Sequence, residues 1–181
     1  EVSAFHQQVR NAIGLQPGPT DALVLGNENR LIMNGLEAHL DCKTSFQSTQ
    51  WTFRFWATLN RFWVETMGWI PSYRMPGTAL HTAGAMVHGQ LHSLHWDIRH
   101  RWNDRAPLND AATDWAPAHH RIDLSLAWKK PRYEVQLAAL NASNSRYSDW
   151  YQINAFGGKY FNPIAPRRLE LTVTWWPTRL R

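Results

Sequence analysis

Histidine and acidic side chains are the groups of this sequence with the most evident chemical use. Of the nine histidines, His119 and His120 are adjacent and follow Asp114 closely, and imidazole and carboxylate groups are common metal ligands. Adjacent residues on a strand point to opposite faces, so this pair could share one ion only where the chain bends. The alternatives are a metal site in a bent loop and, as our preferred interpretation, the polar end of a loop. We expect no resident metal and no cofactor.

Catalysis has less support. The sequence contains no Gly-x-Ser-x-Gly, His-Glu-x-x-His or Walker-type phosphate loop. The single cysteine, Cys42, has no His beside it in a nucleophile pattern. The enzyme alternative is an outer-membrane hydrolase with a dispersed Ser, His and Asp or Asn site, which only geometry can reveal. We expect no catalytic residues.

A row of charges is predicted between residues 94 and 102. Polar side chains occupy every second position, which is typical of a strand with one wet face. The polar positions are His95, Asp97, Arg99 and Arg101, and the apolar positions are Leu94, Trp96, Ile98 and Trp102. We expect the polar set to form a solvated ladder on one face of a sheet.

The same alternation predicts about eight antiparallel strands. It is clear at 51–60, 94–102, 121–130, 133–140 and 167–176, and weaker at about 1–14, 29–44 and 78–90, where Gly84 and Gly89 interrupt it. The connections 44–49, about 90–93 and 129–132 are short, whereas 15–28, 64–77, 104–118 and 143–166 are long. Transmembrane barrels have short periplasmic turns and long extracellular loops. The pattern therefore predicts an all-β fold, a transmembrane antiparallel β-barrel.

Composition agrees with a surface that meets lipid. Charged residues make up 18% of the 181, below the roughly 25% of soluble domains. Aromatic residues make up 13% and include eleven Trp, a residue that concentrates at membrane interfaces. No run approaches the roughly 20 apolar residues of a membrane helix. The net charge of +5 is scattered without a basic block, which argues against a nucleic-acid partner.

Four segments carry a family resemblance. In chain order they are Asn34-Gly35-Leu36-Glu37-Ala38, then Trp69-Ile70-Pro71 with Met75-Pro76, then Leu140-Asn141-Ala142-Ser143-Asn144-Ser145-Arg146-Tyr147, and finally the run from Gly157 to Trp175. Together they resemble the C-terminal β-barrel portion of TonB-dependent outer-membrane receptors. The end departs from that pattern, because the family usually stops on an aromatic residue and here Pro177 follows Trp176. Pro177 has no N–H for a ladder, so we expect it to end the strand.

The resemblance implies a plugged barrel of the 22-stranded type, of which residues 1–181 are the C-terminal segment. We expect the remaining strands, the plug and the TonB box on a second chain or a missing part of the same receptor. The implied energising partners are TonB, ExbB and ExbD. The expected location is the bacterial outer membrane, in contact with its lipid and lipopolysaccharide. The implied function is active transport of a scarce nutrient such as a siderophore, cobalamin or haem complex, and not an enzyme activity.

Three sets of residues follow from this interpretation. The closing strand, which in the family resembles the assembly signal, contains Pro166, Arg167, Leu169, Leu171, Val173 and Trp175. Long-loop aromatics that either contact a ligand or pack the loop are Trp69, Tyr73, Trp115, Trp150 and Tyr151. Two interfacial girdles are predicted, from Trp51, Trp128 and Trp175 at the short-turn end and from Phe62, Trp63 and Trp102 at the long-loop end.

Two other architectures remain open. A complete eight-stranded outer-membrane barrel with a structural or adhesion role would close with a filled lumen. That lumen would have to hold Arg54, Trp56, Asp97, Arg99, Arg101 and Arg121. A soluble ligand-binding barrel would need its apolar residues inside, which the Trp-rich strand ends disfavour. Ladder pairing between residues 1–13 and 167–176 would identify the eight-stranded barrel.

Overall fold

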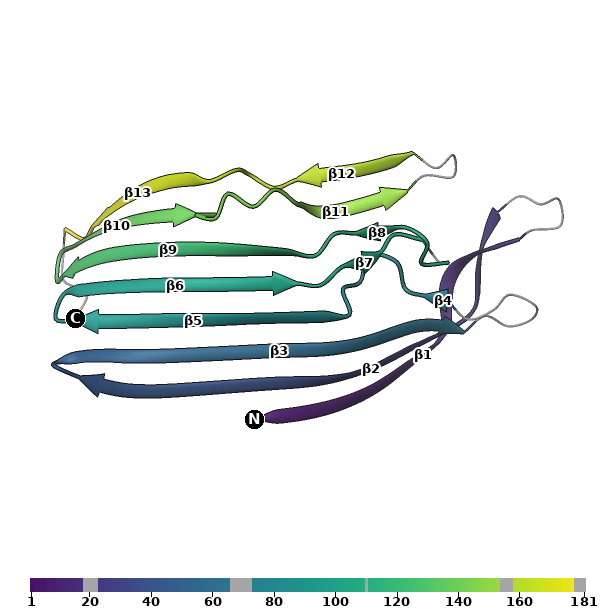
Figure 1. Cartoon of the computed structure of the whole chain (residues 1–181), viewed down its shortest axis with the longest axis horizontal. Coiled ribbons are helices and arrows are strands. Elements are labelled where there is room, and N and C mark those ends of the chain that lie inside the picture. The colour runs from purple at the N-terminus through teal and green to yellow at the C-terminus, as the bar shows by residue number, and fades with distance from the viewer. Residues whose placement is uncertain (18–22, 66–72, 110, 154–157, 178–181) are drawn as a thin grey trace.

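The computed structural model describes residues 1–17, 23–65, 73–109, 111–153 and 158–177, and its regular elements are strands (Figure 1). The long strands are β1 (Val2–Pro17), β2 (Leu23–Phe46), β3 (Thr49–Glu65), β5 (His81–Leu91), β6 (Leu94–Asn103), β9 (His119–Lys130), β10 (Tyr133–Leu140) and β13 (Arg168–Trp175). The short strands are β4 (Tyr73–Arg74), β7 (Ala106–Pro107), β8 (Trp115–Ala116), β11 (Ser148–Ile153) and β12 (Lys159–Pro163).

The long strands form one antiparallel sheet in the order β1-β2-β3-β5-β6-β9-β10-β13, with β4 attached to β3. The eight strands predicted from alternation are therefore confirmed. β1 and β13 lie at opposite edges of the sheet and do not pair with each other within the described residues. The ladder that a closed eight-stranded barrel would require is thus not formed.

The two ends of the sheet differ in the length of their connections. The tight turns β2–β3, β5–β6 and β9–β10 lie at one end, on the left of Figure 1, and the longer connections lie at the other. At the β2–β3 turn Gln47 and Ser48 have φ of 46° and 66°. Positive φ at both central residues is what a type I′ hairpin turn requires, because its twist matches that of the flanking strands.

The long connections contain more strand than the alternation predicts. β2 has 24 residues and β3 has 17, so both continue well past the roughly 9 to 11 residues that cross a bilayer. The connections predicted as loops at 104–118 and 143–166 contain the two-stranded ladders β7–β8 and β11–β12. Backbone groups outside the main sheet find hydrogen-bond partners in these small ladders.

Little of the sheet is covered by other parts of the chain. Among the described residues, the buried apolar side chains are Ile32, Val64, Pro107, Ala116 and Ala127. A single layer of this kind is held together by backbone ladders and by cross-strand side-chain pairs, because it has no second layer to pack on. No helix that could cross a membrane occurs in the described part of the chain.

Candidate functional site

The sheet has one mainly apolar face, which we call the apolar face. The ladder register aligns Leu171, Leu137, Leu126, Trp96 and Trp51 through successive strands, and it aligns Leu169, Leu124, Ile98 and Phe53 in the next row. These side chains are unusually exposed for their type, with Leu171 70% and Leu169 73% exposed on the edge strand and Ile98 47% exposed inside the sheet. An exposed apolar area of this extent marks a surface that meets something other than water.

Aromatic rings gather on the apolar face near the tight turns. Trp51 contacts Trp96 edge-on at 5.3 Å between ring centroids, and Trp128 contacts Tyr133 in the same way at 5.3 Å. Trp175 is the ladder partner of Tyr133. The three tryptophans predicted for the short-turn girdle therefore share one face and one end of the sheet.

The second predicted girdle needs a correction. Trp63 and Trp102 belong to the apolar face by register, but Phe62 belongs to the opposite face with its partner Met33. Phe62 and Trp63 are adjacent on β3, and the pleat sends adjacent side chains to opposite faces. Phe62 is therefore not part of a girdle on the apolar face.

The opposite face, the polar face, contains a chain of ion pairs. Arg54 donates to both carboxylate oxygens of Asp41, at 2.8 and 3.2 Å. His88 lies 2.9 Å from Asp97, which also accepts a hydrogen bond of 3.1 Å from the Ser125 hydroxyl. These contacts link β2 to β3, β5 to β6 and β6 to β9.

The predicted ladder of His95, Asp97, Arg99 and Arg101 lies on this polar face, with the register Arg99↔Asp123 and Arg101↔Arg121. Its members differ in their contacts. Arg101 pairs with Asp123 at 3.4 Å, whereas the described contact of Arg99 is to the Met86 sulfur at 3.7 Å. Arg99 is therefore a cation on the polar face without a carboxylate among the described residues.

Gly84 and Gly89 interrupt the alternation because large rings lie over them. A Cβ at Gly84 would come within 2.0 Å of the Trp56 ring on the polar face. A Cβ at Gly89 would come within 2.1 Å of the Trp96 ring on the apolar face. Each glycine pairs directly across the ladder with that tryptophan, so the missing side chain leaves the space that the ring occupies.

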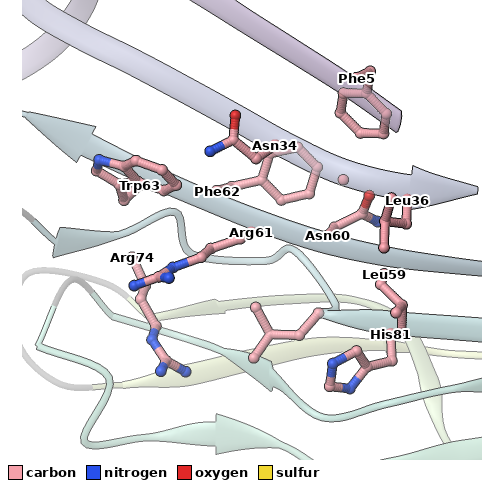
Figure 2. Close-up of a pocket in the computed structure, with 12 residues that line it drawn as sticks. Phe5, Asn34, Leu36, Leu59, Asn60, Arg61, Phe62, Trp63, Arg74 and His81 are labelled. Atoms are coloured by element: carbon pink, nitrogen blue, oxygen red, sulfur yellow. The ribbon is translucent and has the colours of Figure 1, made fainter. Parts of the chain in front are cut away.

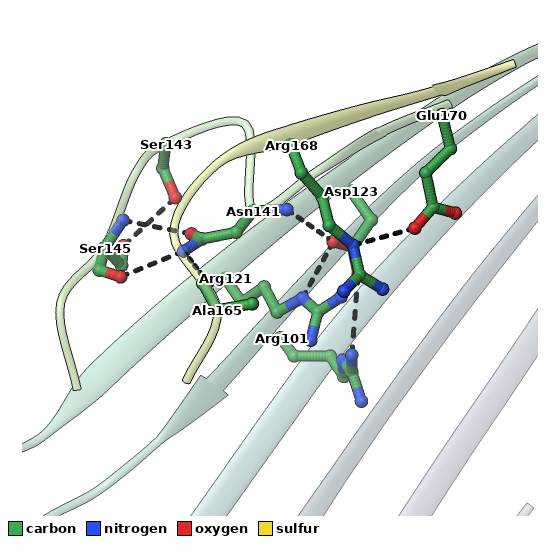
Figure 3. A network of polar contacts seen from close by, with 9 residues as sticks. All are labelled: Arg101, Arg121, Asp123, Asn141, Ser143, Ser145, Ala165, Arg168 and Glu170. Carbon is green, nitrogen blue, oxygen red and sulfur yellow. Dashed lines mark hydrogen bonds and ion pairs between the residues drawn. The ribbon is translucent and has the colours of Figure 1, made fainter. Parts of the chain in front are cut away.

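A buried asparagine joins two of the family-like segments (Figure 3). Asn141 is 2% exposed. Its side-chain amide donates to the carbonyls of Ser145 and Ala165, at 3.0 and 3.3 Å, and its side-chain oxygen accepts from the Ser145 N–H at 3.0 Å. Asn141 has φ of 50°, a conformation that asparagine tolerates better than most residues. We call this set of contacts the Asn141 clasp.

The Asn141 clasp is continuous with the ion pairs of the polar face. Asp123 accepts from the Asn141 backbone N–H at 2.9 Å, from Arg121 at 2.7 Å and from Arg101 at 3.4 Å (Figure 3). The Asp123 side chain is 14% exposed, so its partners offset much of the cost of burying its charge. Asp123 thus connects the polar face to the start of the connection that contains β11 and β12.

The closing segment has the predicted geometry. Leu169, Leu171, Val173 and Trp175 lie on the apolar face, and Arg168, Glu170, Thr172 and Thr174 lie on the polar face. Pro166 and Arg167 precede β13, and the Arg167 N–H donates to the Asn144 side chain at 3.2 Å. The strand ends at Trp175, before Pro177, as expected.

The predicted loop aromatics belong to several different elements. Trp69 lies outside the described residues. Tyr73 lies in β4 and pairs with Val64, and Trp150 and Tyr151 lie in β11 opposite Asn162 and Phe161. Trp115 lies in β8 between two cations, with Arg105 at 4.4 Å and Arg74 at 5.7 Å from its ring.

His119 and His120 occupy opposite faces, as the pleat requires. His119 pairs with Asn103 on the polar face and stacks on Tyr147 with 3.8 Å between ring centroids. His120 pairs with Trp102 on the apolar face, with its ring centroid 6.0 Å from that of His100. Among the described residues no group of three His, Cys, Asp or Glu side chains has a geometry that could hold a metal ion.

A single-layer antiparallel sheet with a mainly apolar face, an ion-paired opposite face and alternating turn lengths is the wall of a membrane-type β-barrel. The family model described as TonB dependent receptor-like, beta-barrel matches residues 1–144. The chain belongs to this family. The run from Gly157 to Trp175, which contains the closing strand, lies beyond the matched residues.

Solved receptors share the fold. The ferric yersiniabactin uptake receptor FyuA from Yersinia pestis is 15% identical with a TM-score of 0.75, and the match covers 95% of this chain and 26% of that one. The siderophore receptor PiuA from Acinetobacter baumannii is 18% identical with a TM-score of 0.77, covering 96% of this chain and 26% of that one. The chain therefore spans about a quarter of the length of these receptors. A comparison with curated proteins gave no match.

Proposed function

We propose that this chain supplies the C-terminal wall of a TonB-dependent active transporter in the bacterial outer membrane. The observation that carries the proposal is the two-faced sheet, in a chain that belongs to the receptor barrel family. The apolar face would meet lipid and the polar face would line a lumen. Transport through that lumen, rather than catalysis, is the activity that this arrangement supports.

The charges of the polar face favour a wide barrel over a narrow one. Arg54, Arg99, Arg101 and Arg121 share that face with Asp41, Asp97 and Asp123. An eight-stranded barrel would enclose these side chains without water, and Arg99 would then be a buried charge with a large desolvation cost. A wide barrel with water and a plug avoids that cost, so residues 1–181 are best placed as one segment of a longer wall.

The edges of the sheet lead to the same proposal. Within the described part of the chain, β1 and β13 each have one side without a strand partner, and in lipid each unsatisfied backbone group costs several kcal/mol. Further strands and a plug, on a second chain or another part of the same receptor, would pair these edges. TonB, ExbB and ExbD would then supply the energy for uptake.

The substrate class that we propose is a bulky, scarce nutrient such as a ferric siderophore, cobalamin or haem complex. Uptake of labelled members of each class should be measured in cells that lack the complete receptor and in cells that express it again. We expect one class to be taken up only with the receptor present and only in a strain with intact TonB. Equal uptake without TonB would contradict active transport and would favour a passive or structural barrel.

The orientation can be tested in the same cells. Cys42 is exposed, so it is first replaced in a Cys42→Ala background. Cysteine at Asp114, in the long connection between β6 and β9, should react on whole cells with a maleimide that does not cross membranes. Cysteine at Ser48, in the tight β2–β3 turn, should react only after the membrane is opened. The reverse result would mean that the tight turns face outward.

A further inference from the structure

A hollow of about 790 Å³ lies where β3 leaves β5, at the end of the long connections (Figure 2). β3 pairs with β5 only as far as Leu59↔His81, and it pairs with β4 again at Trp63↔Arg74. The chain between these two ladders is hydrogen-bonded to β3 at Met75 and Leu80, and to Pro107 of β7 at Gly77. Figure 2 shows Arg61, Arg74 and Trp63 at one end of the hollow and Leu59 and His81 at the other.

The hollow is lined from both faces of the sheet, and its cationic side chains belong to the apolar face. Arg61 and Trp63 alternate with Asn60 and Phe62 on β3, and the register puts them on the same face as Leu59 and Trp51. Arg74 is the ladder partner of Trp63. In a barrel this face is the outside, so the two arginines would point toward the membrane and away from the lumen.

The nearby carboxylates are engaged elsewhere. Glu65 pairs with Arg30 at 3.3 Å, and Asp104 pairs with His81 at 2.8 Å. Arg61 and Arg74 form cation–π contacts, with Trp63 at 5.4 Å and with Trp115 at 5.7 Å, and neither forms an ion pair with a described residue. The hollow therefore has two positive charges that no carboxylate of the described residues offsets.

The position of the hollow along the barrel axis indicates which layer of the membrane it would contact. Arg61 follows Trp51 by ten residues, which at about 3.4 Å per residue and a tilt of about 40° is about 25 Å along the barrel axis. The apolar band of such barrels is also about 25 Å tall. Between the two levels, the apolar face of β3 carries Phe53, Phe55, Ala57 and Leu59. Arg61 thus lies where hydrocarbon ends and lipid headgroups begin.

We propose that Arg61 and Arg74 bind a phosphate group of outer-leaflet lipopolysaccharide, on the lipid A headgroup. Guanidinium groups form paired hydrogen bonds with phosphate oxygens, and Trp63 has the amphipathic ring typical of this interface. Leu36 and Leu59, both in the lining, would contact the acyl chains below. The inference rests on the proposed membrane location but assigns a ligand that is not the transported substrate.

The test uses the complete receptor, purified in detergent and freed of lipid. Binding of bisphosphorylated lipid A, of dephosphorylated lipid A and of inorganic phosphate is measured by native mass spectrometry. The test variant is Arg61→Gln with Arg74→Gln. Arg30→Gln is the matched control, because Arg30 lies on the same face near the same end but pairs with Glu65.

We expect the double variant to bind bisphosphorylated lipid A at least tenfold more weakly, because charged hydrogen bonds to phosphate are lost. Arg30→Gln should bind as the unmodified receptor does. The unmodified receptor should prefer the phosphorylated over the dephosphorylated form, a comparison that needs no variant to fold. Equal binding of both lipid forms, or unchanged binding by the double variant, would overturn the proposal.

Two further readouts separate this inference from the transport proposal. Inorganic phosphate that binds as tightly as lipid A would reveal a free-anion site and overturn the inference. Nutrient uptake should be unchanged in the double variant, and a weaker affinity for the nutrient with normal lipid A binding would also overturn it. If the unmodified receptor binds lipid A but transports no nutrient, and the double variant loses lipid A binding, the proposed function is wrong and the lipid site is supported.

Discussion

On β9 two kinds of environment alternate residue by residue. Leu124, on the apolar face, has the apolar partners Ile98 and Ala139 in the ladders on either side. Asp123, its neighbour in the chain, accepts hydrogen bonds from two arginines and a backbone N–H. The face of the sheet on which a side chain lies, rather than its place along the chain, therefore decides which substitutions this protein tolerates.

The largest contrast is expected on β13. Leu171 lies four residues before Trp175 on the apolar face, about 10 Å from that girdle toward the middle of the bilayer. Leu171→Arg should lower the free energy of unfolding of the complete receptor in lipid vesicles by about 2 to 4 kcal/mol. Thr172→Arg, on the polar face, should be tolerated. Equal losses in denaturant unfolding would remove the assignment of the two faces.

The Asn141 clasp gives a second prediction, because a buried polar group is costly when it loses its hydrogen-bond partners. Asn141→Ala removes three side-chain hydrogen bonds, and we expect a loss of about 2 to 3 kcal/mol. Ser143→Ala is the control, since the exposed Ser143 hydroxyl contacts only the Ser145 hydroxyl among the described side chains, at 3.0 Å.

Hydrogen exchange would locate the effect of the Asn141 substitution. The amides of Ser145 and Arg167, which donate to asparagine side chains, should exchange faster in Asn141→Ala and at the normal rate in Ser143→Ala. Unchanged exchange at both amides in Asn141→Ala would mean that the clasp does not hold these segments together.

A smaller effect is expected where a ring covers a glycine. Gly84→Ala would push a methyl group into the Trp56 ring, and we expect a loss of about 1 to 2 kcal/mol, within the usual range for overpacking. The same substitution in a Trp56→Ala background should cost less, because the ring is gone. Additive losses in this double-mutant cycle would show that the glycine serves another purpose.

The smallest effect is predicted for Arg99. Its described contact is a sulfur atom at 3.7 Å, so Arg99→Gln should change the free energy of unfolding by less than about 0.5 kcal/mol. Arg121→Gln should cost more, because Arg121 donates to the largely buried Asp123 at 2.7 Å. Chemical unfolding of both variants measures the difference, and an equal cost would contradict the pairing seen at Asp123.

The sequence by itself determined the eight long strands, their faces and the ends at which they turn. The period-two alternation is visible in the sequence of segments such as Leu169 to Trp175, because each side chain must suit either the apolar or the polar face. The tight turns and the stop at Pro177 are also local, since they depend on the φ values and N–H groups of a few residues. These features could be predicted without knowing any long-range contact.

Only the tertiary structure decided which distant residues meet. Gly84 and Gly89 interrupt the polar–apolar alternation of the sequence, and only the structure shows that Trp56 and Trp96 lie over them. Asn141 belongs to one family-like segment, but its buried amide is joined to Ala165 in another, and no local signal announces that contact. The hollow with Arg61 and Arg74 exists because two ladders end at different residues. The glycine–tryptophan contacts, the Asn141 contact and the hollow all depend on how distant segments align with one another. That alignment is a property of two segments together, so the sequence of one segment does not reveal it.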